Sequence, residues 1–258
     1  MTSIPDISVI TVVYNGAHSI EKCLQSVADQ EKVAYEHIVI DGGSTDGTVD
    51  ILKRHADKLA YWCSEKDAGI ADAMNKGILH AKGNWIIFIH ADDGLVSPDV
   101  LAKALAKMPL KVDIVAFPVL FGSLGNLRLH PPRPAGFWTR FKLGMCHQGM
   151  FVRRALFQRI GVFDTGFGIC MDYEHVLRAV SAGASVRVFA EPAVAWMDDA
   201  GISSRRDWPS LRTRFLEEKR AQHLHVTSLP MRCLYFFYWS AYLPYRKIRS
   251  MLKDKRAG

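Results

Sequence analysis

Polar side chains, most of them carboxylates, follow each strand-like segment in the first part of this 258-residue chain. The segments ISVITVV, HIVI, AYWCS and WIIFI are followed, in turn, by Tyr14 and Asn15; by Asp41; by Glu65, Lys66 and Asp67; and by His90, Asp92 and Asp93. Crowded carboxylates repel one another unless a cation neutralises them, and Mg²⁺ is held by one or two carboxylates together with substrate phosphates. The pattern therefore predicts a site for a hard divalent cation and a phosphate-bearing ligand.

These polar groups meet only if their segments are neighbouring strands of one parallel sheet. Ile7–Val13 is rich in β-branched residues and apolar on both faces, which is typical of a strand buried in a parallel sheet. A helical stripe of apolar residues follows at Ile20, Cys23, Leu24, Val27 and Ala28, and strand and helix alternate four times. We therefore predict an α/β fold with a Rossmann-like, mostly parallel sheet flanked by helices, and a ligand site at the carboxyl ends of its strands.

Some elements are predicted from local patterns. The second helix carries apolar residues from Val49 to Leu59, and the alternation loosens near Val112 into a smaller mixed subregion. That subregion contains a predicted hairpin of VDIVAFPVLF with LRLH, a helix from about Asp172 to Gly183 and a strand at Val186–Ala190. Beyond Pro209 the pattern indicates a charged helix and a helical tail dense in aromatic residues.

The composition excludes several classes of protein. Apolar residues make up 49% and charged residues 23%, as in a globular protein and unlike a disordered chain. The five cysteines include no CxxC pair, so neither a disulfide framework nor a zinc site is indicated, and a reducing cytosol fits best. No signal peptide is recognisable, and the longest uncharged apolar stretch, 13 residues at Cys233–Tyr245, is below the ~20 that span a bilayer. We expect a cytoplasmic location.

The common phosphate-binding motifs GxGxxG and GxxxxGK[ST] are absent from the sequence. GGSTDG at Gly42–Gly47 is glycine-rich and leaves two interpretations open. It could contact phosphates through its backbone, or it could be a turn in which Ser44 or Thr45 caps the next helix.

Five motifs occur in an order and at a spacing that resemble one enzyme family. They are IVIDGGSTDGT, SEKDAGIADAMNKGI, KGNWIIFIHADDGLVSPDVL, HQGMFVRRALFQRIGVFD and MDYEHVLR, and the similarity covers about residues 6–205. On these motifs the chain resembles the family 2 glycosyltransferases of the GT-A fold, especially bacterial ones that build surface polysaccharides. The resemblance implies transfer of a sugar from a UDP-, GDP- or dTDP-linked donor to a glycan or a polyprenyl-diphosphate-linked glycan.

The resemblance also implies roles for single residues. The nucleotide-sugar would be held by Thr11, Tyr14, Asn15, Asp41, Asp67, Gly69, Asn75 and Asp92, and a Mg²⁺ or Mn²⁺ cofactor by Asp92 and Asp93. His90 stands where many members carry the first Asp of an Asp-x-Asp-Asp motif, which puts metal affinity in question. Residues 1–110 would form the nucleotide-sugar half and 111–210 the acceptor half of a catalytic domain at 1–210, with a tail at 211–258.

Asp172 falls where the family keeps its general base. An acceptor hydroxyl is a poor nucleophile, so a carboxylate within hydrogen-bond reach must take its proton. The cation would neutralise charge on the leaving diphosphate, and a single attack implies inversion at the sugar. Asp172 also precedes an amphipathic helix and could be its N-cap, and both roles can coexist.

Three positions correspond to places where relatives approach the acceptor. They are His147, Gln148 and Gly201, the last within the loop Met197–Ser204. For His147, a purely structural role remains an equal alternative.

The tail combines aromatic and basic residues. Seven of the eleven residues in Tyr235–Tyr245 are aromatic, and residues 211–258 hold 11 Lys and Arg against 3 Asp and Glu, a net charge of +8. Such a combination favours the headgroup region of an anionic membrane, and we predict a peripheral location on its inner leaflet. Packing of these aromatics against the catalytic domain is an equal alternative, and no nucleic-acid-binding motif accompanies the charge.

Two other functions remain open from the sequence. The substitution at His90 is compatible with a catalytically degenerate protein that binds a nucleotide-sugar or glycan without turnover. A sugar nucleotidyltransferase also uses a parallel sheet and carboxylates, but the segment at Tyr14 and Asn15 lacks the glycine-rich and basic loop expected of one.

Overall fold

The central feature of the computed structural model is a seven-stranded sheet, in a structure that describes residues 4–123, 126–198, 207–226 and 228–257. Its strands are β1 (Ile7–Val13), β2 (Tyr35–Asp41), β3 (Tyr61–Ser64), β4 (Trp85–Phe88), β6 (Ile114–Ala116), β9 (Met150–Arg153) and β10 (Val186–Val188). The order across the sheet is β10-β6-β9-β4-β1-β2-β3. Every neighbouring pair is parallel except those of β9, which runs antiparallel to β4 and β6. The predicted mostly parallel sheet is confirmed.

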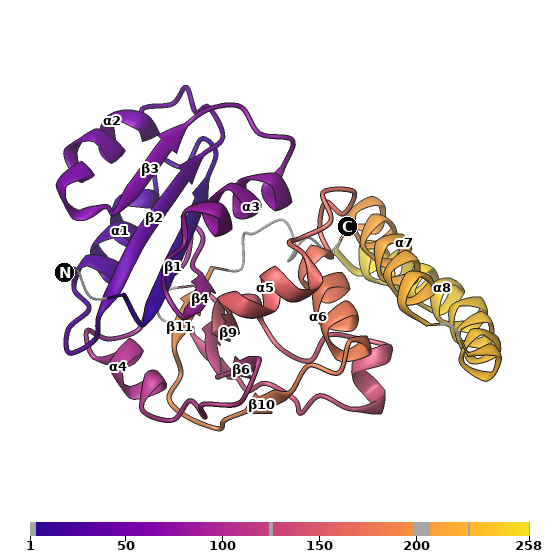
Figure 1. Cartoon of the computed structure of the whole chain (residues 1–258). Coiled ribbons are helices and arrows are strands. Elements are labelled where there is room, and N and C mark those ends of the chain that lie inside the picture. The colour runs from indigo at the N-terminus through magenta and orange to yellow at the C-terminus, as the bar shows by residue number, and fades with distance from the viewer. Residues whose placement is uncertain (1–3, 124–125, 199–206, 227, 258) are drawn as a thin grey trace.

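Helices cover both faces of this sheet (Figure 1). One face packs against α1 (Ile20–Ala28), α2 (Thr48–Arg54) and α4 (Val100–Leu105), and the other against α3 (Ile70–His80), α5 (Arg154–Ile160) and α6 (Met171–Ser181). Alternate residues of β1 point to opposite faces, so Val9 and Ile10 belong to different apolar layers. Gly77 of α3 allows a close approach, because a Cβ there would lie 2.4 Å from Cγ2 of Ile10.

The second helix is shorter than its sequence pattern predicts. It ends at Arg54, and a short 3-10 turn at Ala56–Lys58 replaces its last part. Leu59 is extended, and the next amide, that of Ala60, donates to the carbonyl of His37 on β2. The chain must leave the helix at this point in order to enter β3.

A second sheet of four strands packs beside the carboxyl end of β4. Its order is β5 (Gly94–Leu95), β11 (Ala195–Met197), β7 (Val119–Phe121) and β8 (Arg128–His130). The predicted hairpin is confirmed only for β7 and β8, which are antiparallel. The segment VDIVAFPVLF divides at Pro118, so β6 belongs to the main sheet and β7 to the second; proline lacks the amide that continuing the ladder requires.

Two further helices, α7 (Trp208–His225) and α8 (Leu229–Ala257), lie side by side and project from the main body (Figure 1). Gln222 of α7 joins three segments, since its amide nitrogen donates to the carbonyl of Phe141 (3.2 Å) and the hydroxyl of Tyr173 (3.1 Å), and its oxygen accepts from Trp239 (2.6 Å). His225 lies 2.7 Å from the buried carboxylate of Glu174 on α6. Among the described residues, no helix is both long and apolar enough to cross a bilayer.

Candidate functional site

Hydrogen bonds join the loops that follow β1 and β2. Asn15, which has a positive φ of 49°, donates its backbone amide to Oγ of Ser44 (2.7 Å) and accepts from the amide of Thr45 (2.9 Å). The expectation that Ser44 or Thr45 caps the next helix is wrong, because α2 begins after Gly47, whose φ is +100°. GGSTDG is instead a turn that orders the exits of two strands.

Asp41 organises that turn from the end of β2. Its fully buried carboxylate accepts from the amides of Gly43 (3.1 Å) and Ser44 (2.9 Å), from the hydroxyl of Ser64 on β3 (2.6 Å), and from the hydroxyl of Ser44. Four donors occupy most of the acceptor capacity of a carboxylate. Asp41 therefore positions the backbone of the strand exits.

The side chains after β1 and β3 meet over the same turn. A Cβ on Gly42 would lie 2.5 Å from Oδ2 of Asp67 and 3.4 Å from the ring of Tyr14. Asp67 also accepts from the amide of Gly69 (2.9 Å). Gly69 has a φ of +118° and immediately precedes α3. The structure thus brings together five predicted positions: Tyr14, Asn15, Asp41, Asp67 and Gly69.

Three predicted nucleotide-binding residues lie outside this cluster: Asp92, at the exit of β4, and Thr11 and Asn75. Oγ1 of Thr11 is fully buried between strands, 3.0 Å from Nε2 of His37 and 3.7 Å from Sγ of Cys23. The amide of Asn75 exchanges two hydrogen bonds of 2.9 Å with the backbone of Phe163. Both side chains are engaged within the protein, and their contacts to a nucleotide stay predictions.

The exit of β4 holds a second cluster, next to the first. A Cβ on Gly16 would lie 3.5 Å from Cβ of Ala91, which precedes Asp92. Asp93 is almost completely buried and accepts from Nε2 of Gln148 (2.7 Å) and from the backbone of Asp198. Burial, and then the charge of Asp92, raise the pKa of Asp93 to about 7 against the opposing hydrogen bond from Gln148.

Two histidines connect this cluster to α6. The rings of His90 and His147 meet edge to face at 4.6 Å. Burial, followed by the neighbouring His147, holds the pKa of His90 well below its usual value, so His90 is neutral near pH 7. The other side of His147 faces Asp172, with 3.8 Å between Nδ1 and Oδ2.

Asp172 lies in the first turn of α6. The residue before the helix is Cys170, so the proposed N-cap role of Asp172 is wrong; its Oδ1 accepts instead from the amide of Tyr173 (2.7 Å). Burial, with the charges of Asp172 and Asp93, raises the pKa of the Cys146 thiol to about 12. That thiol therefore lies within electrostatic reach of both carboxylates, and the β4 exit and the start of α6 form one site.

The antiparallel strand β9 explains why His147 and Gln148 reach this site. Because β9 runs opposite to β4, the residues that precede β9 lie at the carboxyl end of β4. Gln148 was predicted as an acceptor contact, whereas its amide nitrogen holds Asp93. The predicted contact at Gly201 lies outside the described residues.

The site fits a divalent cation of a particular kind. Among the described residues, no three His, Cys, Asp or Glu side chains converge as an all-protein metal cage. Asp92 and Asp93 supply two carboxylates, and the buried atoms Oε1 of Gln148 and Nε2 of His147 have no hydrogen-bond partner in the part of the chain described. These groups suit a cation that completes its coordination with water and ligand phosphates.

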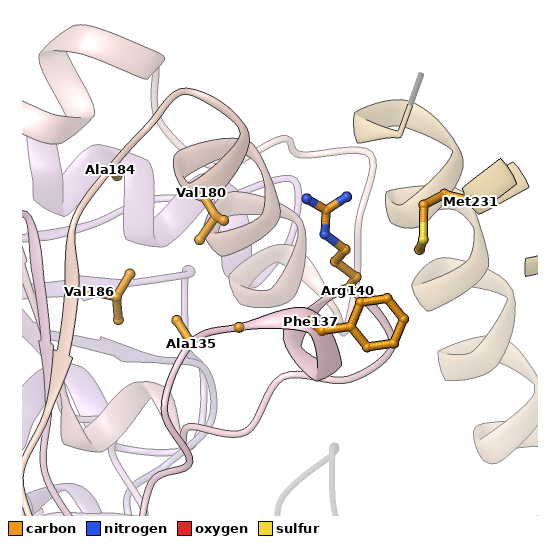
Figure 2. Close-up of a pocket in the computed structure, with 8 residues that line it drawn as sticks. Ala135, Phe137, Arg140, Val180, Ala184, Val186 and Met231 are labelled. Carbon is orange, nitrogen blue, oxygen red and sulfur yellow. The ribbon is translucent and has the colours of Figure 1, made fainter. Parts of the chain in front are cut away.

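A cavity of about 590 Å³ lies away from this site, between α6, β10 and α8 (Figure 2). Its lining is apolar apart from one cation, and consists of Ala135, Gly136, Phe137, Arg140, Val180, Ala184, Val186 and Met231. Without carboxylates or strand exits, this cavity does not extend the cluster around Asp93.

Two relatives that are similar over most of this chain are named glycosyltransferases. The chain is 36% identical over 216 residues, 80% of each chain, to an uncharacterized glycosyltransferase of Mycobacterium tuberculosis (strain H37Rv). It is 33% identical over 202 residues, 76% of this chain and 78% of the relative, to a PGL/p-HBAD biosynthesis glycosyltransferase of Mycobacterium bovis (BCG).

Solved structures share the GT-A fold at lower sequence identity. Residues 1–349 of Staphylococcus aureus TarS in complex with UDP-GlcNAc give a TM-score of 0.63 at 20% identity, over 85% of this chain and 66% of that one. The mannosyltransferase PcManGT of Pyrobaculum calidifontis, in complex with GDP-Man and Mn²⁺, gives 0.62 at 20% identity over 97% of this chain and 88% of that one. The model of glycosyl transferase family 2 matches residues 8–163, and this chain belongs to that family.

Proposed function

We propose that this protein transfers a sugar, with inversion, from a nucleotide-sugar to a hydroxyl of a glycan or lipid-linked glycan during polysaccharide biosynthesis. The observation that carries the proposal is the contact chain from Asp93 through Gln148 and His147 to Asp172. These contacts connect Asp93, where the charged leaving group would lie, to Asp172, whose carboxylate can receive a proton. Family membership accounts for glycosyl transfer and argues against a nucleotidyltransferase.

The donor lies over the strand exits in this proposal. The cluster of Tyr14, Asn15 and Asp67 around Gly42 offers a ring and polar groups to a base and ribose. The solved neighbours in complex with UDP-GlcNAc and GDP-Man support a nucleotide-sugar donor. Residues 1–110 form the donor half and 111–210 the acceptor half of a catalytic domain at 1–210, followed by the tail at 211–258.

Asp92 and Asp93 would hold Mg²⁺ or Mn²⁺ beside the donor diphosphate. When bound, the cation supplies positive charge against the charge that develops on the leaving group. Gln148 keeps the buried carboxylate of Asp93 oriented, and His90 contributes no charge because burial keeps it neutral.

Asp172 takes the proton of the acceptor hydroxyl. One of its oxygens accepts from the amide of Tyr173, and the other faces His147 at 3.8 Å, so the second oxygen is open to a hydroxyl entering between them. At 3.8 Å the imidazole is too far away for a direct hydrogen bond, so this oxygen keeps its capacity to accept a proton from the acceptor hydroxyl. Transfer to a lipid-linked glycan would occur at the inner face of the cell membrane.

The test is Asp172→Asn in the full chain. We expect release of nucleoside diphosphate in the presence of acceptor to fall by about 10³-fold, while calorimetry with Mn²⁺ gives unchanged donor affinity. Asp50→Asn, at a 74% exposed carboxylate that pairs with Lys53 on α2, is the control and should keep full activity. An active Asp172→Asn variant would remove the base assignment, and donor binding without any release by the unmodified protein would indicate a degenerate binding protein.

A further inference from the structure

The outward side of α8 carries many exposed apolar side chains. Among the described residues, eighteen large hydrophobic side chains are exposed, and seven of them belong to this one helix: Leu229, Leu234, Phe236, Phe237, Tyr245, Ile248 and Met251. A solvent-facing helix surface normally carries polar residues, and contiguous apolar patches mark interaction sites. This surface, which we call the outer face of α8, is therefore a candidate interaction site.

The packing of α8 on the protein uses the opposite side of the helix. Tyr235, Trp239, Tyr242, Arg246 and Ser250 recur at helical spacing and form its inner stripe. Tyr235 and Trp239 are buried, and their polar atoms bond to the carbonyl of Arg140 (2.8 Å) and to Gln222 (2.6 Å). The fold thus accounts for the inner stripe and leaves the outer face without a structural role.

The outer face has a helical repeat of its own. Phe237, Ala241, Pro244, Ile248 and Met251 follow one another at intervals of four, three, four and three residues, and all are exposed. Phe236 and Phe237 are 67% and 68% exposed, although they sit next to the buried Tyr235. Alternation between buried and exposed aromatics within one turn shows two separate apolar faces on one helix.

The positive charge of α8 favours an anionic membrane over a second copy of the chain. Arg232 and Lys247 are exposed beside the outer face, and no acidic residue occurs between Leu229 and Met251. A second copy of the chain docked through the same face would bring like charges together, whereas anionic headgroups are complementary to them. A single helix with an apolar face and basic flanks is typical of a segment that lies in the membrane interface.

The neighbouring surface has the same character. Phe137 and Trp138 are 53% and 77% exposed on the segment that contacts α8 through the rings of Phe141 and Tyr235. The guanidinium of Arg140 stands beside Phe137 at the cavity between α6 and α8, across from Met231 (Figure 2). Exposed aromatic and basic groups thus also occur on the part of the catalytic body that packs against α8.

We propose that the outer face of α8 lies in the headgroup region of an anionic lipid bilayer, parallel to its surface. The stretch from Leu229 to Met251 would cover about 35 Å of the interface at 1.5 Å per residue. Binding in this way needs no donor, metal or sugar transfer, so the proposal stands independently of the proposed function. It would keep the site at Asp172 close to lipid-linked molecules.

The test is sedimentation of the full chain with vesicles in the absence of any nucleotide-sugar. One set contains phosphatidylcholine and phosphatidylglycerol, and the other contains phosphatidylcholine alone. We expect binding to the anionic vesicles, and a loss of at least about tenfold in affinity for the triple variant Phe236→Ser, Phe237→Ser, Ile248→Ser. The matched control replaces Leu79 and Leu110 with Ser, since both are more exposed (79% and 91%) but lie elsewhere, and it should bind normally.

Charge reversal tests whether basic residues of α8 attract the anionic headgroups. Arg232→Glu with Lys247→Glu should weaken binding to anionic vesicles about tenfold or more and bring it close to the level on phosphatidylcholine alone. Lys82→Glu with Lys111→Glu, at exposed positions of the catalytic body, is the matched control. Thermal unfolding of each variant identifies any loss of fold.

Three results would overturn the proposal. They are the absence of binding to anionic vesicles, unchanged binding by a folded triple serine variant, and a lipid-free dimer that the same variant dissociates. The last result would assign the outer face of α8 to a second copy of the chain.

Discussion

Two buried carboxylates near the ends of strands on either side of β1 have opposite surroundings. Asp41 closes β2 and accepts four hydrogen bonds, two from backbone amides and two from serine hydroxyls. Asp93 follows β4, accepts from Gln148 and the backbone of Asp198, and lies beside the like charge of Asp92. Both side chains are nearly inaccessible to solvent, so burial alone does not distinguish them.

The difference lies in how far each charge is compensated. Asp41 is surrounded by four donors, and it stabilises the turn and the end of β3 that supply them. The pKa of Asp93 is raised to about 7 by burial and by Asp92, so its ionised form is costly unless positive charge arrives from outside the chain. The first carboxylate serves the fold, and the proposed cation would compensate the charge of the second.

The largest effect that tests this contrast is expected for Asp93→Asn. Sugar transfer should fall by about 10³-fold, because an amide cannot replace a carboxylate beside a bound cation. The free energy of unfolding without metal should stay equal or rise, since a neutral amide avoids the burial of charge. Release of nucleoside diphosphate and urea unfolding measure the two quantities.

Asp50→Asn serves as the control for that variant, because the Asp50 carboxylate is 74% exposed. It should change neither quantity. A fully active Asp93→Asn protein would show that Asp93 is another structural carboxylate, and the contrast with Asp41 would disappear.

Asp41→Asn should behave in the opposite way. The amide oxygen can take the place of Oδ2 and keep both backbone amides, but its NH₂ then replaces Oδ1, which accepts from the hydroxyl of Ser44. One acceptor and the charge behind the other hydrogen bonds are lost, so the free energy of unfolding should fall by about 3 kcal/mol. Urea denaturation of Asp41→Asn and Asp93→Asn under identical metal-free conditions provides the measurement. If Asp41→Asn were the more stable of the two, the assigned roles would be reversed.

Much of the β4 exit is predictable from the sequence, and its partners are not. Asp92 and Asp93 follow a buried apolar strand, and parallel strands end at one edge, so the sequence predicts their position at this edge. Gln148 and His147 reach the same place only because β9 is antiparallel to β4. The short segment Met150–Arg153 carries no signal for strand direction, so the pairing of Gln148 with Asp93 required the three-dimensional structure.

The sequence composition also does not reveal which aromatic residues of α8 are buried, because burial depends on their position around the helix. The composition of the aromatic tail is consistent both with membrane contact and with packing on the domain. The packing alternative is correct for Tyr235 and Trp239, whereas Phe236 and Phe237 on the same turn are exposed. Composition counts aromatic residues without regard to phase, and a helix separates neighbours by about 100°.

Stability should depend on pH through Asp93. Its pKa in the folded state is raised from 3.8 to about 7, so the folded protein holds a proton that the unfolded chain has lost. This contribution is fully present below the unfolded value and disappears as pH rises through the folded value. The metal-free protein should therefore lose about 2 kcal/mol of unfolding free energy between about pH 5 and pH 8, relative to Asp93→Asn.

That measurement compares two proteins, so the titration of groups that do not interact with Asp93 cancels. Saturating Mn²⁺ should make the unfolding free energy less dependent on pH, since a bound cation favours the ionised carboxylate. Parallel pH profiles for the two metal-free proteins would mean that Asp93 is already compensated within the fold.

The smallest effect is expected for Ser64→Ala, and it tests how Asp41 acts. Oγ of Ser64 donates to Asp41 from β3 at 2.6 Å, while three other donors remain. Because Ser64 is exposed, water can replace its hydroxyl, and the free energy of unfolding should fall by only about 1 kcal/mol. In the Asp41→Asn background the same change should have a smaller effect, since the charged partner is gone. An equal loss in both backgrounds would mean that Ser64 stabilises β3 without Asp41, and that hydrogen bonding to Asp41 is weaker than its four donors imply.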